Sequence, residues 1–168
     1  MSAAPITYTP PEPGDLSMIC AMQSAYYAEH HGLDQIYESV VAAQIDEFLG
    51  RYDRAGDFVL TARLDDRLAG AITIDCGGSP PVPDTKWARL RWFIVSDALR
   101  GQGAGREMMS RAMAFVRQSG VVGCYLSTFK GLDAAGHLYR DAGFVLTSEA
   151  PAETWGKPVI EQRYEWRP

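Results

Sequence analysis

The residues with the clearest chemical potential form one glycine-rich stretch, Arg100-Gly101-Gln102-Gly103-Ala104-Gly105-Arg106. Its three glycines stand at alternate positions, and without Cβ atoms they let a ligand approach the backbone N–H groups closely. An apolar run over 90–95 precedes the stretch, and a helical pattern follows it to about Ser119. The start of a helix has unpaired N–H groups and a partial positive charge. The stretch therefore predicts a site for a phosphate or pyrophosphate, which Arg100 and Arg106 can reinforce.

Two known phosphate-binding motifs do not explain this stretch. The P-loop pattern fails because the only Gly-Lys pair in the sequence is followed by proline. The dinucleotide pattern G-x-G-x-x-G fails because its last glycine, counted from Gly101, is replaced by Arg106. The pattern that fits is Arg-x-x-Gly-x-Gly, at Arg100, Gly103 and Gly105. A turn that only allows close packing of strand and helix is the structural alternative.

Hydrophobic periodicity predicts the elements that position the glycine-rich stretch. Helices are expected over 16–31, 38–52 and 134–141, and from the glycine-rich stretch to about 119; strands are expected over 6–8, 58–64, 68–76, 86–95, 123–128, 144–150 and 159–166. Asp15 and Asp133 are expected to cap the first and last helices. A short loop, Asp65-Asp66-Arg67, is expected to join a hairpin. The run 90–95, with only Arg91 charged, is expected to be buried on both faces. The element order predicts an α+β fold with a central βαβ unit.

A second motif, Tyr139-Arg140-Asp141-Ala142-Gly143-Phe144, fits the pattern Tyr-x-x-x-Gly-Phe, and Ala135 lies one helical turn before it. Together with the Arg-x-x-Gly-x-Gly loop and the element order, it resembles the GNAT acyl-CoA N-acyltransferases. The resemblance is strongest to acetyltransferase domains that also occur fused to winged-helix regulators. It implies the GNAT fold, a mixed central sheet of about six to seven strands flanked by about four helices, in one domain over residues 1–168. In one departure, Leu132 stands where many family members have asparagine.

The resemblance also implies how acetyl-CoA would bind. A V-shaped gap between the strands over 86–95 and 123–128 would hold the pantetheine arm, bonded by the backbones of Phe93 and Val95. The Phe93 N–H would also stabilise an oxyanion at the thioester carbonyl. Arg100 to Arg106 would hold the pyrophosphate, while Thr128 and Ala135 would face the cofactor from the opposite wall.

The implied chemistry is acetyl transfer to an amine, with Tyr139 as the general acid for the departing thiolate. The alternative for Tyr139 is a packing residue that only bonds the cofactor. The general base is open: Glu29, His30, His31 or water can serve. His137 is expected to lie on the surface. A covalent route through Cys124 is the less simple mechanism, because no histidine neighbours it in the sequence.

Composition restricts the class of protein. The chain has 168 residues, is 46% hydrophobic and 22% charged, and has no apolar run of membrane-spanning length, which is typical of one soluble domain without a membrane partner. Three scattered cysteines indicate neither a disulfide framework nor a metal site, and favour the cytoplasm. The net charge of −5 argues against a nucleic-acid partner. Residues 86–117 nevertheless carry seven basic and two acidic side chains, which suits a polyanionic cofactor.

The sequence thus predicts an acetyl-CoA-dependent N-acetyltransferase that modifies a primary amine of a small molecule, amino acid or peptide. No metal is expected, and a homodimer through the final strands is implied by the resemblance. The alternative function is a sensor or regulatory module that binds acetyl-CoA without turnover. A third interpretation treats the glycine-rich stretch as structural packing.

Overall fold

The structure, a computed structural model, describes residues 4–168; Met1 to Ala3, which the expected domain includes, lie outside the described residues. The elements in order are β1 (Ile6–Thr9), α1 (Asp15–His31), α2 (Gln35–Leu49), β2 (Phe58–Leu64), β3 (Arg67–Asp75), β4 (Trp87–Val95), a short 3₁₀ helix η1 (Asp97–Leu99), α3 (Ala104–Gln118), β5 (Gly123–Phe129), α4 (Asp133–Asp141), β6 (Val145–Ala152) and β7 (Val159–Trp166). The expected α+β class and the type of every expected element are confirmed, and only η1 had no counterpart in the sequence pattern.

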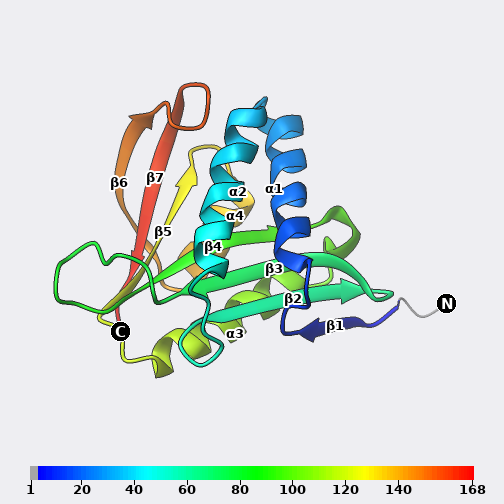
Figure 1. Ribbon diagram of the computed structural model, residues 1–168, viewed down its shortest axis with the longest axis horizontal. Coiled ribbons are helices and arrows are strands. Elements are labelled where there is room, and N and C mark those ends of the chain that lie inside the picture. Colours follow the sequence, from blue (N-terminus) through cyan, green and yellow to red (C-terminus); the bar gives the residue numbers. More distant parts are fainter. Residues whose placement is uncertain (1–3) are drawn as a thin grey trace.

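Within residues 4–168 the seven strands form one mixed sheet, in the order β1-β2-β3-β4-β5-β7-β6. All neighbours are antiparallel except β4 and β5, which pair in parallel at only three positions. The last of these pairs is Arg89 with Tyr125. Beyond it β5, β6 and β7 fan away from β4, as Figure 1 shows. The structure therefore contains the expected gap between these two strands.

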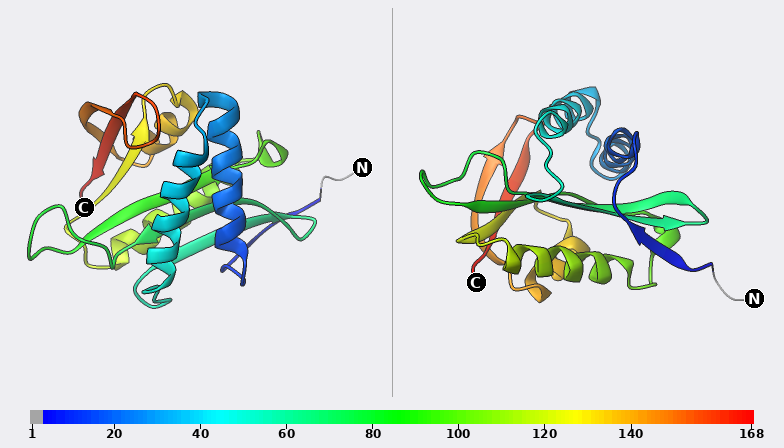
Figure 2. Two further views of the ribbon diagram at one scale, coloured as in Figure 1. Left: turned by 45° about the horizontal axis from the view of Figure 1, so that its top comes forward. Right: turned by 60° about the horizontal axis from the view of Figure 1, so that its bottom comes forward.

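Helices cover both faces of the sheet (Figure 2). Helices α1 and α2 lie on one face and α3 lies on the other, with α4 near the diverging strands. Two apolar clusters fill these layers: one includes Ile19 and Phe48 on the α1–α2 side, and the other includes Met108 and Met113 on the α3 side. The gap between β4 and β5 therefore lies between two helical layers, one on each face of the sheet.

Strand β4 contains a bulge just where it leaves β5. Ala71 of β3 pairs with Ile94 and Thr73 pairs with Arg91, so Trp92 and Phe93 together face one residue of β3. Trp92 takes a left-handed φ of +48°, which is unusual for a bulky side chain. As a result Trp92 packs on Phe48 of α2, whereas Phe93 turns toward the α4 side.

The expectation that 90–95 is buried on both faces is wrong for its last four residues. Leu90 and Arg91 are buried, but the four residues from Trp92 to Val95 are only half-buried. The reason is that β4 has lost its parallel neighbour there, so these residues face the gap instead of another strand.

Two predicted helix caps are also wrong. The residue before α1 is Gly14, and Asp15 is buried within the helix, where its carboxylate pairs with Arg63 of β2. The residue before α4 is Leu132, and no side chain caps that helix. Asp133 follows it as the first helical residue. An aspartate at a predicted helix start therefore does not show that its side chain caps the free N–H groups of that helix.

Two other boundaries differ from the expectation. Helix α2 begins at Gln35 rather than Glu38, because the Asp34 side chain accepts a hydrogen bond from the Ile36 N–H at 3.0 Å. The β2–β3 turn contains only Asp65 and Asp66, whose φ angles are +49° and +58°. Two consecutive positive φ angles are typical of the tight two-residue hairpin turn.

Candidate functional site

The glycine-rich stretch forms an open cradle of backbone amides at the start of α3. Gly101 and Gly103 have φ angles of +74° and +76°, and a Cβ at either position would meet no atom within 4 Å. The backbone N–H groups of Gly101 and of 103–106 have no hydrogen-bond acceptor among the described residues. Helix α3 also begins without a side-chain cap. These positions therefore offer several converging donors at the positive end of a helix, an arrangement that suits an anion.

Two arginines flank the cradle and are free to reorient. The side chains of Arg100 and Arg106 are each 77% exposed. Arg100 pairs with Asp97 at 2.5 Å, and Arg106 approaches Asp141 only to 3.7 Å. Exposed ion pairs contribute little stability, so both guanidinium groups can turn toward a bound polyanion at small cost. Gln102 behaves differently, since its side chain donates back to the Ala98 carbonyl at 2.8 Å.

A pocket of about 550 Å³ runs from this cradle along the end of β4 to α4, and we call it the loop pocket. It is lined by ten of the twelve residues that the sequence analysis assigned to the site: Phe93, Val95, Arg100, Gly101, Gly103, Ala104, Gly105, Arg106, Ala135 and Tyr139. Gln102 and Thr128 do not line it. Leu132 does, at the place where the family often has asparagine.

Gly105 keeps the neck of the loop pocket open. A Cβ at this position would lie 3.2 Å from Leu138 Cδ1 and 3.4 Å from Val95 Cγ2. A larger side chain would therefore enter the space between α3, α4 and β4. The cradle, the flanking arginines and this open neck together fit a long ligand with a polyphosphate at one end.

A second pocket of about 100 Å³ lies on the α1–α2 face of the sheet, and we call it the inner pocket. It is bounded by α1, α2, β4, β5 and β7, and Thr128 lines this pocket rather than the loop pocket. The two pockets share four lining residues, Gln23, Tyr27, Phe93 and Tyr139. They meet at the gap between β4 and β5, so ligands in the two pockets can come together there.

Tyr139 lies at this junction, on α4. Its side chain is buried, with the ring centroids of Phe93, Phe144 and Tyr164 between 5.7 and 6.3 Å away. Burial raises the pKa of the Tyr139 phenol well above its ordinary value. Among the described residues none forms a hydrogen bond with its hydroxyl. The phenol is therefore protonated at neutral pH and has its proton available for a ligand.

Gln23, which no sequence motif identified, connects α1 to the junction of the two pockets. Gln23 is buried, and its Nε2 donates to the Phe93 carbonyl at 3.4 Å. Its Oε1 accepts from the Tyr37 hydroxyl at 3.5 Å. The signal that could have identified it is a polar residue on the apolar face of the first helix, since a buried amide needs partners.

Glu161, on β7, is the one carboxylate among the described residues that line the inner pocket. The Trp155 indole donates to its Oε2 at 3.2 Å. The sequence analysis missed Glu161 because nothing in the local sequence links β7 to Tyr139. Two arginines of β4, Arg89 and Arg91, line the same pocket.

The base candidates from the sequence lie elsewhere. Glu29, His30 and His31 line neither pocket. Burial, together with the charges of His30 and Lys157, lowers the pKa of His31. His31 packs its ring 5.4 Å from that of Tyr27 and leaves Nε2 buried without a partner.

The remaining nucleophile candidate and the surface histidine behave as expected. Cys124 is fully buried and lines neither pocket, and burial raises the pKa of its thiol to about 12. His137 is exposed. Across residues 4–168 no cluster of histidine, cysteine and acidic side chains is placed to hold a metal ion. No helix in the same residues is both long enough and apolar enough to cross a membrane.

Comparisons with known proteins agree with this geometry. Residues 18–144 match the profile of a family described as the acetyltransferase (GNAT) family. No curated relative matches the sequence significantly.

Several solved structures share the fold. The yncA protein of Salmonella typhimurium, solved with its cofactor acetyl-CoA, is 16% identical, with a TM-score of 0.72 over 98% of this chain and 94% of that one. A ribosomal-protein-alanine N-acetyltransferase of Brucella melitensis is 15% identical, with a TM-score of 0.72 over 96% and 99%. An N-acetyltransferase of Staphylococcus aureus is 12% identical, with a TM-score of 0.73 over 98% and 99%. At these identities the likeness establishes the fold alone.

Proposed function

Because the chain belongs to the GNAT acetyltransferase family, we propose that it moves an acetyl group from acetyl-CoA to a primary amine of a small molecule, amino acid or peptide. One observation carries the proposal: the pocket at the start of α3 and the pocket between α1, α2 and the sheet meet at Phe93 and Tyr139, in the gap where β4 and β5 part. The loop pocket has the shape and the donors for acetyl-CoA, and the inner pocket can admit the amine. Direct attack within a ternary complex needs this arrangement, because the rate then comes largely from positioning.

The residues of the loop pocket fit acetyl-CoA. The amides of 103–106 and the guanidinium groups of Arg100 and Arg106 would hold the pyrophosphate, and the neck at Gly105 would pass the pantetheine arm. Ala135 would contact the arm from α4. Bound in this way, acetyl-CoA supplies a thioester whose carbonyl carbon accepts the amine.

Three groups at the junction have roles in this proposal. The backbone N–H of Phe93 donates to the reacting carbonyl oxygen, and Gln23 holds the Phe93 carbonyl, in the next peptide unit of the same residue. Tyr139 gives its proton to the leaving sulfur. Glu161 takes the proton from the incoming ammonium group, directly or through water, because it is the acidic side chain that faces the inner pocket. The buried, protonated thiol of Cys124 supports direct transfer over a covalent route.

A direct test incubates the protein with acetyl-CoA and a panel of amines, amino acids and short peptides. Free thiol would be measured continuously, and mass spectrometry would identify any acceptor that gains an acetyl group. We expect at least one amine to be acetylated with stoichiometric thiol release. Tight binding of acetyl-CoA by calorimetry without acetylation of any acceptor would instead favour the sensor function. Absence of acetyl-CoA binding would overturn both and leave the cradle as a packing feature.

A further inference from the structure

The inner pocket continues into a third pocket of about 300 Å³, which we call the outer pocket. The two share Gln44, Arg89 and Arg91, and the outer pocket extends between α2 and the start of the β3–β4 loop. Together they form a channel that leads from Tyr139 toward the surface. An acceptor bound at the junction therefore has its far end among the side chains of the outer pocket.

The outer pocket contains an ion-pair network with all its carboxylate oxygens engaged. Asp75 is 2% exposed and accepts from Arg51 on both oxygens, at 2.7 and 2.8 Å. Its Oδ2 also accepts from Arg91 at 3.0 Å. Arg51 reaches Glu47 as well. This network neutralises Arg51 and Arg91 and has no free carboxylate oxygen left for another cation.

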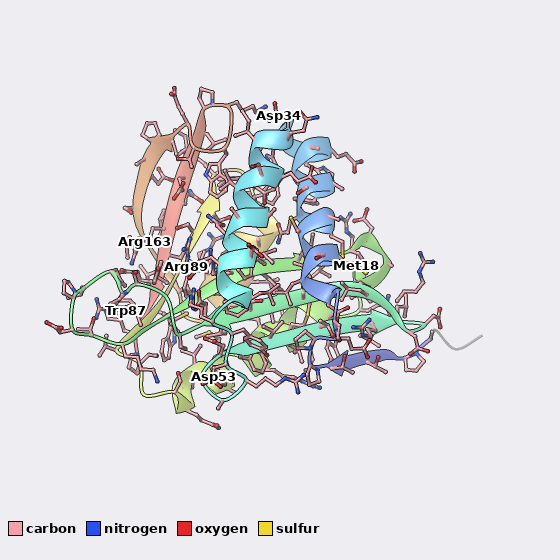
Figure 3. All side chains as sticks on the ribbon, in the orientation of Figure 1. Met18, Asp34, Asp53, Trp87, Arg89 and Arg163 are labelled. Atoms are coloured by element: carbon pink, nitrogen blue, oxygen red, sulfur yellow. The ribbon has the colours of Figure 1, made fainter. Side chains whose placement is uncertain are left out.

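Arg89 is the third arginine of the outer pocket, and no carboxylate of residues 4–168 lies within ion-pair distance of it. Three arginines thus face two carboxylates, which leaves the charge of Arg89 uncompensated. Its Nε is buried without a partner. Its guanidinium lies 5.5 Å from the centroid of the Tyr125 ring, on which Arg163 also stacks at 4.2 Å. Figure 3 shows Arg89 and Arg163 at the strands beside α2. Stacking fixes the position of Arg89 but does not neutralise it.

The opposite charge lies farther along the channel. Arg89 pairs in register with Tyr125, whereas Glu161 pairs with Phe129, four residues farther along β5. Four strand residues correspond to about 13 Å. The pocket therefore offers an unpaired cation near the point where the strands part and a carboxylate near the open end of the gap. A molecule with complementary charges would fit in one orientation.

From this polarity we propose that the acceptor is a small amino carboxylate, whose carboxylate binds Arg89 and whose amine lies at Glu161 and Tyr139. The inference rests on the proposed acetyltransferase function and narrows its acceptor class. A guanidinium suits a carboxylate because it presents parallel N–H donors. Arg89 is half-buried and its buried Nε has no hydrogen-bond partner, which a ligand carboxylate would supply. The inner pocket, at about 100 Å³, admits a small molecule more readily than a folded segment.

The test compares matched acceptors that differ only in charge. Amino carboxylates of increasing chain length are paired with their uncharged amides and assayed with saturating acetyl-CoA. We expect the carboxylates to be preferred and Arg89→Gln to remove the preference. The variant should raise KM for the carboxylates by about 10-fold to 100-fold, with little change for the amides or for acetyl-CoA.

The structure offers a matched control for this variant. Arg163 stacks on the same Tyr125 ring but lines none of the three pockets and pairs with Glu165 at 3.0 Å. Arg163→Gln should therefore keep the preference, and Arg89→Lys should restore part of it because it keeps the charge. Thermal unfolding would show whether each variant is folded.

A binding measurement separates this inference from the function on which it rests. Calorimetry with CoA-saturated protein would titrate the same acceptor pairs without requiring turnover. If carboxylates bind tighter than amides and Arg89→Gln abolishes the difference, the inference holds even where no acetylation is observed. Equal affinity for both members of each pair, or equal losses in Arg89→Gln and Arg163→Gln, would overturn it.

Discussion

The side-chain amide of Gln23, on α1, donates to the backbone carbonyl of Phe93, on β4, at 3.4 Å. This contact joins two segments 70 residues apart in the sequence, at the point where the loop and inner pockets meet. It fixes the carbonyl of Phe93, the residue whose own N–H, in the preceding peptide unit, is proposed to face the reacting carbonyl. The bulged end of β4, which has β3 on one side but no strand on the other, is thereby held from α1.

Replacing Gln23 with methionine tests this support. Methionine keeps the length of the side chain but cannot donate to Phe93, so the peptide can shift within the gap. We expect kcat to fall by about 10-fold to 100-fold, because small misplacements at a reacting centre are costly. Steady-state kinetics would check this, with the affinity for acetyl-CoA measured separately. An unchanged kcat would contradict a positioning role for Gln23.

Tyr139→Phe removes only the hydroxyl from the junction. Loss of a general acid typically lowers the rate by about 10²-fold to 10⁴-fold, so a fall in kcat of that order is expected. The affinity for acetyl-CoA should change little, since the ring and its packing against Phe93 and Tyr164 remain. Rapid-mixing kinetics of thiol release would isolate the chemical step. Wild-type turnover at every pH would rule out the acid role.

Gly105→Val closes the neck of the loop pocket, since even a Cβ there lies 3.2 Å from Leu138. We expect the Kd for acetyl-CoA to rise by at least about 10-fold, which corresponds to about 1.4 kcal/mol. Ala114→Val is the matched control, because it places the same side chain on the exposed face of α3. Calorimetry should show normal affinity for the control. Equal affinities of the two variants for acetyl-CoA would contradict binding of the cofactor at this neck.

Glu161→Gln tests the proposed proton acceptor. The amide keeps the hydrogen bond from Trp155 but cannot take a proton, so kcat/KM should fall by about 10²-fold near neutral pH. At higher pH the amine loses its own proton, and the defect should shrink. Glu29→Gln makes the same chemical change at an exposed residue outside both pockets and should have no effect. If kcat/KM fell in Glu29→Gln but not in Glu161→Gln, the general base would be Glu29, at the end of α1.

Asp75 controls stability as well as the charge of the outer pocket. Burial alone would raise its pKa, but the hydrogen bonds and charges of Arg51 and Arg91 outweigh burial and hold the pKa below its ordinary value. The carboxylate therefore contributes stability above the unfolded-state pKa, about 4, and loses it as the pH falls through the lower folded-state pKa.

Asp75→Asn should consequently destabilise the fold by about 3 kcal/mol at neutral pH, because it leaves the buried Arg91 without its partner. The free energy of unfolding in urea would measure this, and the difference from the wild type should narrow below pH 4. Asp46→Asn, at an exposed position on α2, is the control and should change stability little. If the difference in free energy of unfolding between Asp75→Asn and the wild type did not change with pH, the variant would have lost packing rather than a charge interaction.

The cradle could be read from the sequence because its chemistry is local. Gly101, Gly103 and Gly105 follow one another within a single turn and helix start, and the backbone amides they expose belong to the same short segment. The same holds for Tyr139, which a local motif identified. The types of the elements also followed from hydrophobic periodicity. The helix cap at Asp15 could not be predicted in this way, because the partner of Asp15 is Arg63 on a distant strand.

The sequence by itself determined the family resemblance, the α+β order and the anion cradle, since each depends on neighbours along the chain. Only the tertiary structure decided which side chains line the inner pocket. Arg89 and Glu161 lie 72 positions apart and reach one pocket because β7 inserts between β5 and β6, and β4 parts from β5 after Tyr125. When strand order and strand divergence bring charged side chains together, local sequence spacing does not reveal it. The proposed roles of Glu161 and Arg89 could therefore be inferred only from the fold.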